Sequence, residues 1–207
     1  MATETQAPKR GRPRFITRER IAEAGMKMGL PDLTFVGVAS VLGVSHMALY
    51  KHVPNLEELK RIVAAEIFNC WQIPEVADGE YSDLESYLIA FTSSLCTLVR
   101  AHPGLAPYLI RRAAATPSMM AKIDAHHCVV GRIFGISKVQ ARWALSMVAF
   151  HCIAVADTVY STVDDPNASV SKNKADNAEI EADFELGMRT LIAGALLQLK
   201  EIPRKAR

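Results

Sequence analysis

Residues 34–52 are the stretch that most narrowly limits how this chain can fold. Their sequence, TFVGVASVLGVSHMALYKH, predicts two short helices joined by a tight turn. Gly43 can take the positive φ that such a turn requires, and Ala39 leaves room for the second helix to cross closely. Thr34 and Ser45 can each accept a hydrogen bond from backbone N–H groups at a helix start. The pattern indicates a helix-turn-helix, which places its second helix in the major groove of DNA.

The segments on either side of this motif carry a family resemblance. Upstream, IAEAGMKMG at residues 21–29 indicates a first helix that ends at a glycine; downstream, LYKHVPNLEEL at residues 49–59 indicates the start of a fourth helix. Residues 16–62 therefore resemble the DNA-binding domain of the TetR/AcrR family of bacterial repressors. The resemblance implies an all-α fold, in which a three-helix DNA-binding domain precedes a larger helical domain for ligand binding and dimerisation. Leu56 departs from the family, which usually has a phosphate-contacting lysine there.

The distribution of charge along the chain agrees with a division into a DNA-binding domain and a second domain. Residues 1–61 contain ten Lys/Arg against six Asp/Glu, a net charge of +4, whereas the remaining residues contain fourteen against sixteen, a net charge of −2. A basic front end suits a DNA-binding domain attached to a regulatory one. We expect a basic arm at residues 1–15, a helix-turn-helix domain at 16–62, and a helical ligand-binding and dimerisation domain at 63–203.

Capping residues predict where the helices begin. Asn55 with Glu58 and Ser82 with Glu85 have the spacing of a capping box, and Ser137 can cap a long helix. We expect helices at residues 17–29, 35–42, 46–52, 56–72, 83–101, 138–162 and 176–200, further helices that start at Pro103 and Pro117, and a polar loop at 164–175. No segment indicates a strand, so the sequence predicts an all-α protein.

The second helix of the motif would present its exposed side chains to DNA. Ala48 and Leu49 are expected to face inward. His46 and Met47 are candidates for base edges, because histidine can exchange hydrogen bonds with a base and a thioether suits the thymine methyl group. By resemblance and position, the candidates for phosphate contacts are Thr34, Ser45, Tyr50, Lys51 and His52. Tyr50 and His52 could instead merely pack against the fourth helix.

The basic arm is a separate candidate for DNA contact. Arg10-Gly11-Arg12-Pro13 resembles the core of an AT-hook, in which an extended arginine-rich segment lies in a narrow, A/T-rich minor groove. We expect Arg10, Arg12 and Arg14 to contact the minor groove or the phosphates. The alternative is a solubilising tail without a role in recognition.

The family resemblance also implies an apolar cavity in the second domain, whose small-molecule effector releases DNA. Methionine and aromatic side chains form adaptable apolar walls. The candidate lining residues are Trp71, Phe91, Leu105, Met119, Met120, Ile123, Trp143, Met147, Phe150 and His151. His151 would supply a polar group in the cavity. Each of these residues could equally be ordinary core.

The last two helices are the expected dimer interface. The candidates on the final helix are Phe184, Gly187, Met188, Leu191, Gly194 and Ala195, although an apolar stripe alone also fits a core helix. Residues 143–160 are apolar on nearly every side. They are interrupted by His151 and Asp157, so we expect a buried interface helix and not a membrane span.

Several classes of site are not indicated. The sequence has no GxSxG, HExxH, P-loop, GxGxxG or CxxC motif, so we expect no enzyme activity and no cofactor. A metal site that combines His127, Cys128, His151 and Cys152 would need two helices to face each other, and its spacing matches no known ligand set. A redox switch at Cys128 or Cys152 is disfavoured, because neither has an evident thiolate-stabilising helix N-terminus.

The sequence therefore favours a ligand-responsive regulator, by family default a repressor, that binds a palindromic operator in double-stranded DNA as a homodimer. Widely spaced cysteines and the absence of a signal-peptide pattern favour a reduced, cytoplasmic protein. The alternative function is a constitutive, A/T-preferring DNA-organising protein that uses the AT-hook-like arm. That alternative leaves the helical body of about 145 residues without a role.

Overall fold

The computed structural model describes residues 16–77, 79–161 and 173–202. Its helices are α1 (Arg18–Met28), α2 (Phe35–Leu42), α3 (His46–Tyr50), α4 (Leu56–Cys70), α5 (Leu84–Ala101), α6 (Ala106–Ile110), α7 (Pro117–Ile133), α8 (Lys138–Ser161) and α9 (Asn173–Gln198). Short 3₁₀ turns follow at Arg112–Ala114 and Leu199–Glu201. No strand occurs in these three segments, and the expected all-α fold is confirmed. Most of the loop expected at residues 164–175 lies outside the described residues.

The first four helices begin at the capping residues that the sequence predicted. Thr17, Thr34, Ser45 and Asn55 each accept a hydrogen bond from the N–H three residues later, at 2.8–3.3 Å. Each cap satisfies one of the donors that the first turn of a helix leaves without a partner. Ser137 caps α8 in the same way, because its hydroxyl accepts from the N–H of Gln140.

Three expected helix starts are wrong. Helix α9 begins at Asn173, three residues before the expected start at residue 176. The N-cap of α5 is Asp83, whose carboxylate accepts from the N–H of Ser86 at 2.8 Å, while the Ser86 hydroxyl accepts from the N–H of Asp83. A carboxylate at this position also interacts favourably with the positive end of the helix dipole, which Ser82 would not do. Pro103 starts no helix; the next helix begins at Ala106, with Pro107 in its first turn.

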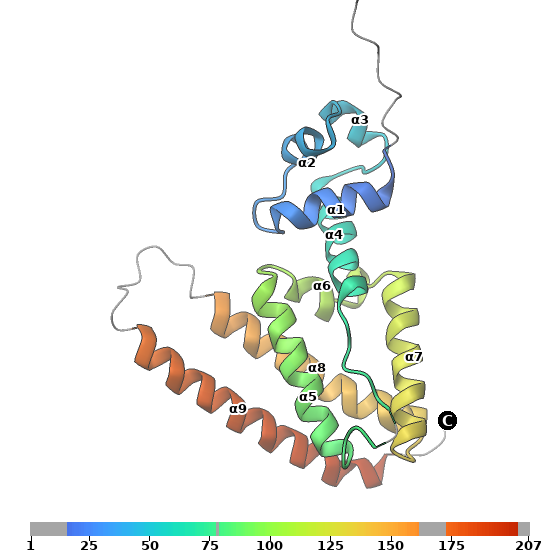
Figure 1. The fold of residues 1–207 in the computed structure, drawn as a ribbon, viewed down its shortest axis with the longest axis vertical. Coiled ribbons are helices and arrows are strands. Elements are labelled where there is room, and N and C mark those ends of the chain that lie inside the picture. Colours follow the sequence, from blue (N-terminus) through green and yellow to red (C-terminus); the bar gives the residue numbers. More distant parts are fainter. Residues whose placement is uncertain (1–15, 78, 162–172, 203–207) are drawn as a thin grey trace, which may run out of the picture.

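The helices form two groups joined by α4 (Figure 1). Helices α1, α2 and α3, which we call the reading head, lie at one end of the molecule, and α5 to α9, which we call the body, lie at the other. Helix α4 runs from the reading head into the body and crosses the domain boundary proposed at residues 62 and 63. The orientation of α4 therefore sets the position of the reading head on the body.

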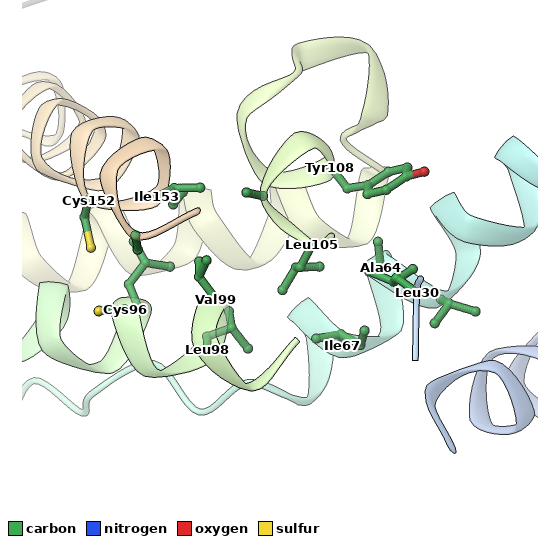
Figure 2. Packing of buried hydrophobic residues seen from close by; sticks show 14 of the residues in the cluster. Leu30, Ala64, Ile67, Cys96, Leu98, Val99, Leu105, Tyr108, Cys152 and Ile153 are labelled. Carbon is green, nitrogen blue, oxygen red and sulfur yellow. The ribbon is translucent and has the colours of Figure 1, made fainter. Parts of the chain in front are cut away.

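A continuous set of buried apolar side chains connects the two groups. Leu30, which follows α1, lies beside Ala64 of α4, and the core continues to Leu105 and to α5 and α8 (Figure 2). Leu30 and Ala64 are 3% and 1% exposed, so this junction is as dry as the interior of the body. Burial of apolar surface across the junction resists independent motion of the reading head.

Helix α8 crosses the middle of the body. Its segment Lys138–Val159 is long and apolar enough to span a membrane by length and composition alone. Within that segment, 44% of the most apolar window is buried inside the fold, where α8 packs against α5, α7 and α9. Helix α8 thus packs on the body with part of its surface, and helices of a helical core meet the same criterion of length and hydropathy.

Candidate functional site

The turn between α2 and α3 has the geometry of a helix-turn-helix. Gly43 adopts a left-handed conformation with φ 67° and ψ 40°. The N–H groups of Gly43 and Val44 then donate to the carbonyls of Ser40 and Ala39, at 3.1 and 3.0 Å, and end α2. This conformation is costly for a residue with a Cβ atom, so the glycine fixes the angle between α2 and α3.

Helix α3 presents its polar and flexible side chains to solvent, as the sequence predicted. Leu49 is fully buried in the reading head and anchors the helix. His46, Met47 and Lys51 are exposed, and Met47 has 64% of its surface open. Thr34, Ser45 and His52 are exposed as well. Helices α2 and α3 lie at the end of the molecule remote from the body (Figure 1).

Tyr50 is the exception among the expected DNA contacts, because it has a defined packing partner. Its ring stacks on Phe35 of α2, with centroids 4.2 Å apart and planes 10° from parallel. The alternative expectation, that Tyr50 packs on the fourth helix, is therefore corrected. About half of the Tyr50 surface remains exposed. The stack holds the ring against α2 while leaving the side chain accessible to a phosphate.

At the start of α4, Leu56 occupies the position where the TetR/AcrR pattern usually has a lysine. Leu56 is exposed there and offers no charge to DNA. Glu58 engages two nearby positive side chains, Arg18 at 2.5 Å and Arg61 at 2.7 Å, whereas Lys60 lies one turn after Leu56. The hydrogen bond from Arg61 is the main reason that the pKa of Glu58 lies below its ordinary value. The arginines of the arm, Arg10, Arg12 and Arg14, lie outside the described residues.

In the body, four of the expected effector-site residues lie close to the end of α4. Trp71 follows α4 directly, and its ring contacts both Phe68 and Phe91, with centroids 5.6 and 6.0 Å apart. The Trp71 indole N–H donates to the Ser94 hydroxyl at 3.0 Å. Met119 and Ile123 of α7 pack in the same cluster as Phe68 and Trp71. Leu105 is completely buried in the core near α6 (Figure 2).

The other expected effector-site residues do not join this group. Met120, Met147 and Phe150 are each at least 41% exposed, and His151 is also exposed, while Trp143 is half-buried. The expectation that His151 supplies a polar group inside an apolar cavity is corrected, because its side chain lies on the surface of the chain. The error arose because the neighbours of His151 in sequence are apolar, but they occupy other faces of α8.

The polar group in the interior is supplied by a pair that sequence reasoning missed. Tyr87 of α5 is fully buried, and its hydroxyl oxygen lies 2.7 Å from Nε2 of His126 on α7. The Tyr87 ring also contacts Phe91, Phe134 and Tyr81. Trp71, Tyr81, Tyr87, Phe91, His126 and Phe134 thus form one aromatic cluster that joins the end of α4 to α5 and α7. The sequence signal for this cluster was the spacing of four residues between Tyr87 and Phe91, which places both rings on one face of a helix.

The half-buried His126 predicts a dependence of stability on pH. Burial is the main reason that the pKa of His126 is lowered to about 4. An unfolded chain protonates a histidine near pH 6.5, so the stabilisation is complete above about pH 6.5 and decreases as the pH falls towards 4. Between about pH 7 and 4.5, the wild-type protein should lose about 2 kcal/mol more unfolding free energy than His126→Gln, measured by urea denaturation. Equal losses in both proteins would exclude His126 as the responsible group.

Helix α9 uses two different faces. Met188 and Ala195, expected at the dimer interface, are buried against the chain's own body, and Leu191 is half-buried. Phe184 and Met188 line a groove of about 250 Å³ between α5 and α9, at whose edge Arg100 and Glu181 form an ion pair at 3.3 Å. Gly187 and Gly194 lie on the exposed face, where an added Cβ atom would meet nothing within 4 Å. The same face exposes Leu186 and Leu197.

The cysteines and histidines do not gather into a metal site in the part of the chain that the structure describes. No group of three or more His, Cys, Asp or Glu side chains lies close enough there to hold an ion. All four cysteines are free thiols. Burial raises the pKa of Cys152 to about 12, which makes this thiol a poor nucleophile.

The geometry defines a class of protein: a helix-turn-helix reading head carried by one long helix on an all-helical body. No family model and no curated protein matches the sequence. Among solved structures, the TetR family protein ActR of Streptomyces coelicolor, in complex with actinorhodin, is 21% identical with a TM-score of 0.65, over 87% of this chain and 95% of that one. A TetR variant from Acinetobacter baumannii AYE, in complex with minocycline, is 19% identical with a TM-score of 0.66, over 89% and 99%.

A third structure agrees with these two. The transcriptional regulator SCO7222, a TetR from Streptomyces coelicolor, is 22% identical with a TM-score of 0.55, over 87% of this chain and 97% of that one. These similarities extend over the reading head and the body together. The chain therefore has the fold of the TetR family of transcriptional regulators.

Proposed function

We propose that this chain is a DNA-binding transcriptional regulator, by family default a repressor, that a small apolar effector releases from a palindromic operator. The observation that carries the proposal is α3, whose buried Leu49 anchors it while His46, Met47 and Lys51 are free to meet DNA. An exposed recognition helix on a rigid turn has no evident use in an enzyme or a purely structural helical protein.

The aromatic cluster supports a role for an apolar effector. It lies at the end of α4, so a ligand that changes its packing would act directly on the helix that carries the reading head. Two proteins of the same fold were solved with bound ligands, actinorhodin and minocycline. We place the effector against Trp71, Phe91 and Met119, with the Tyr87–His126 pair as the polar contact.

A homodimer is part of the proposal, because one short recognition helix offers few base contacts. Two copies related by a two-fold axis would read the two halves of a palindrome. The exposed face of α9, with Leu186, Gly187, Gly194 and Leu197, is the proposed contact, together with exposed Met147 and Phe150 of α8. The free thiols fit the proposed cytoplasmic location.

The deciding experiment is selection of bound fragments from genomic DNA of the source organism, with purified protein at near-physiological salt. Enrichment of a short palindrome near a promoter would support an operator-specific dimer. Enrichment of A/T-rich DNA without a palindrome would contradict it, and would favour the DNA-organising function based on the arm.

His46 provides a test of base reading on α3. His46→Ala should relax the preference at one position of each half-site by about 1–3 kcal/mol and leave the other positions unchanged, measured by binding-site selection. His52→Ala is the contrasting variant, since loss of a phosphate contact should weaken binding to all sequences alike. An unchanged preference profile in His46→Ala would remove His46 from the base-reading residues.

A further inference from the structure

A lysine from another helix binds the backbone at the carboxyl end of α4. Lys122 of α7 directs its ammonium group at the last turn of α4 and donates to the carbonyls of Phe68 at 3.1 Å, Asn69 at 2.8 Å and Trp71. An ammonium group has three N–H bonds, and here each has a backbone carbonyl partner. Carbonyls at the end of a helix lack the N–H donors of a following turn, and Lys122 supplies donors there. The Phe68 carbonyl also accepts from the N–H of Trp71 at 3.3 Å.

Three further features favour this arrangement over a surface contact. The lysine is half-buried, and burial lowers its pKa. Its ammonium group also lies 5.5 Å from the centre of the Phe68 ring, within the range of a cation–π interaction. The positive charge faces the negative end of the α4 dipole. One turn earlier on α7, Ser118 accepts a hydrogen bond from Asn69 at 3.2 Å.

The position of Lys122 connects two parts of the molecule. Lys122 and His126 are four residues apart and therefore lie on one face of α7. His126 holds Tyr87 of α5, whereas Lys122 holds the backbone of Trp71, whose ring belongs to the same aromatic cluster. Helix α7 thus fixes the end of α4 and forms one wall of the proposed effector site.

We propose that Lys122 is the positioning residue that fixes the pivot of α4, and that it thereby sets the separation of the two reading heads in the dimer. This inference rests on the proposed function. Helix α4 has 15 residues and is about 22 Å long at 1.5 Å per residue. A tilt of about 10° around its carboxyl end displaces its amino end by about 4 Å, close to the 3.4 Å rise of one base pair. Loosening the pivot should therefore change the spacing between half-sites that the dimer accepts.

The test measures spacer preference and needs no effector. The DNA library contains two copies of the selected half-site. The spacer between them varies by about five base pairs on either side of its length in the natural operator, for which the expected centre-to-centre distance is one helical turn. The wild-type protein should enrich one spacer length. Lys122→Met should enrich two or more adjacent lengths and bind the natural operator about three- to tenfold less tightly, with the same half-site sequence. Lys122→Arg, which keeps the charge and its donors, should restore most of the single preference.

The control is Lys138→Met. Lys138, the first residue of α8, forms an exposed ion pair with Asp124 of α7 at 2.7 Å. It should keep the wild-type spacer profile. A folded Lys122→Met protein with the wild-type spacer preference would overturn the proposal. If Lys122→Met lacks a cooperative thermal transition, the milder Lys122→Gln replaces it, and a wild-type spacer preference in that variant would overturn the proposal in the same way. If the wild-type protein selects no palindrome, the proposed function itself is contradicted. If the Lys122 variants keep the wild-type spacer preference, only the proposed role of Lys122 is contradicted.

Discussion

Replacement of Gly25 by alanine is expected to destabilise the reading head by about 2 kcal/mol, although alanine normally favours a helix over glycine by up to about 1 kcal/mol. Gly25 lies in α1 where it crosses α4, and a Cβ atom there would lie 2.3 Å from Cγ2 of Val63. Val63 is fully buried and its branched side chain has little freedom to rotate, so the two helices would have to separate. Urea denaturation measures the loss.

A double-mutant cycle isolates this contact. Val63→Ala alone removes buried methyl groups and costs stability, but in the double variant it also removes the obstacle that the methyl group added by Gly25→Ala would meet. The two substitutions should therefore be coupled favourably by about 1–3 kcal/mol. Gly37→Ala is the matched control: its Cβ atom would lie 2.2 Å from Cε of Met28, the end of a flexible side chain that can move away. Additive effects of Gly25→Ala and Val63→Ala would refute the proposed overlap.

The helix-turn-helix could be predicted from the sequence because its determinants are local. Gly43 supplies a backbone conformation, and Thr34 and Ser45 supply caps three residues from the groups they bind. None of these interactions depends on the rest of the chain. The inward position of Leu49 follows from helical periodicity alone, which is equally local.

The effector site could be predicted only in part, because its members meet across helices distant in sequence. Trp71 and Phe91 were identified as aromatic residues of the second domain, but the same criterion selected Phe150, which is 52% exposed. The pairing of Tyr87 with His126 spans 39 residues and depends on how α7 packs on α5. Composition indicates which residues are apolar, whereas packing decides which of them meet.

Helix α9 illustrates the same limit at the proposed dimer face. A helix that packs on its own body and on a partner is apolar on two sides, so a stripe at helical spacing does not identify which side is which. The sequence pointed to Phe184, Met188 and Ala195, which face the body. The glycines predicted beside them, Gly187 and Gly194, lie on the exposed face. The dimer hypothesis therefore moves from the first group to the second, with Leu186 and Leu197.

Replacement of both Leu186 and Leu197 by glutamate is expected to abolish the dimer and specific operator binding. These side chains are 65% and 72% exposed in the single chain, so the unfolding free energy of the monomer should change by no more than about 0.5 kcal/mol. In the dimer, the substitutions would bury carboxylates without partners near a two-fold axis, which should raise the dimer dissociation constant by at least about a hundredfold. Sedimentation velocity measures the oligomeric state, and a gel-shift titration measures operator affinity.

The matched control for this prediction is replacement of the same two leucines by methionine, which keeps apolar surface and helix propensity. That variant should remain dimeric and should bind the operator as the wild-type protein does. Because each monomer of the proposed dimer would contact only one half-site, the glutamate variant should retain weak, salt-sensitive binding to any DNA and lose the preference for the palindrome. A glutamate variant that remains dimeric would show that the exposed face of α9 is not the interface, and Met147 and Phe150 of α8 would then be the residues to replace.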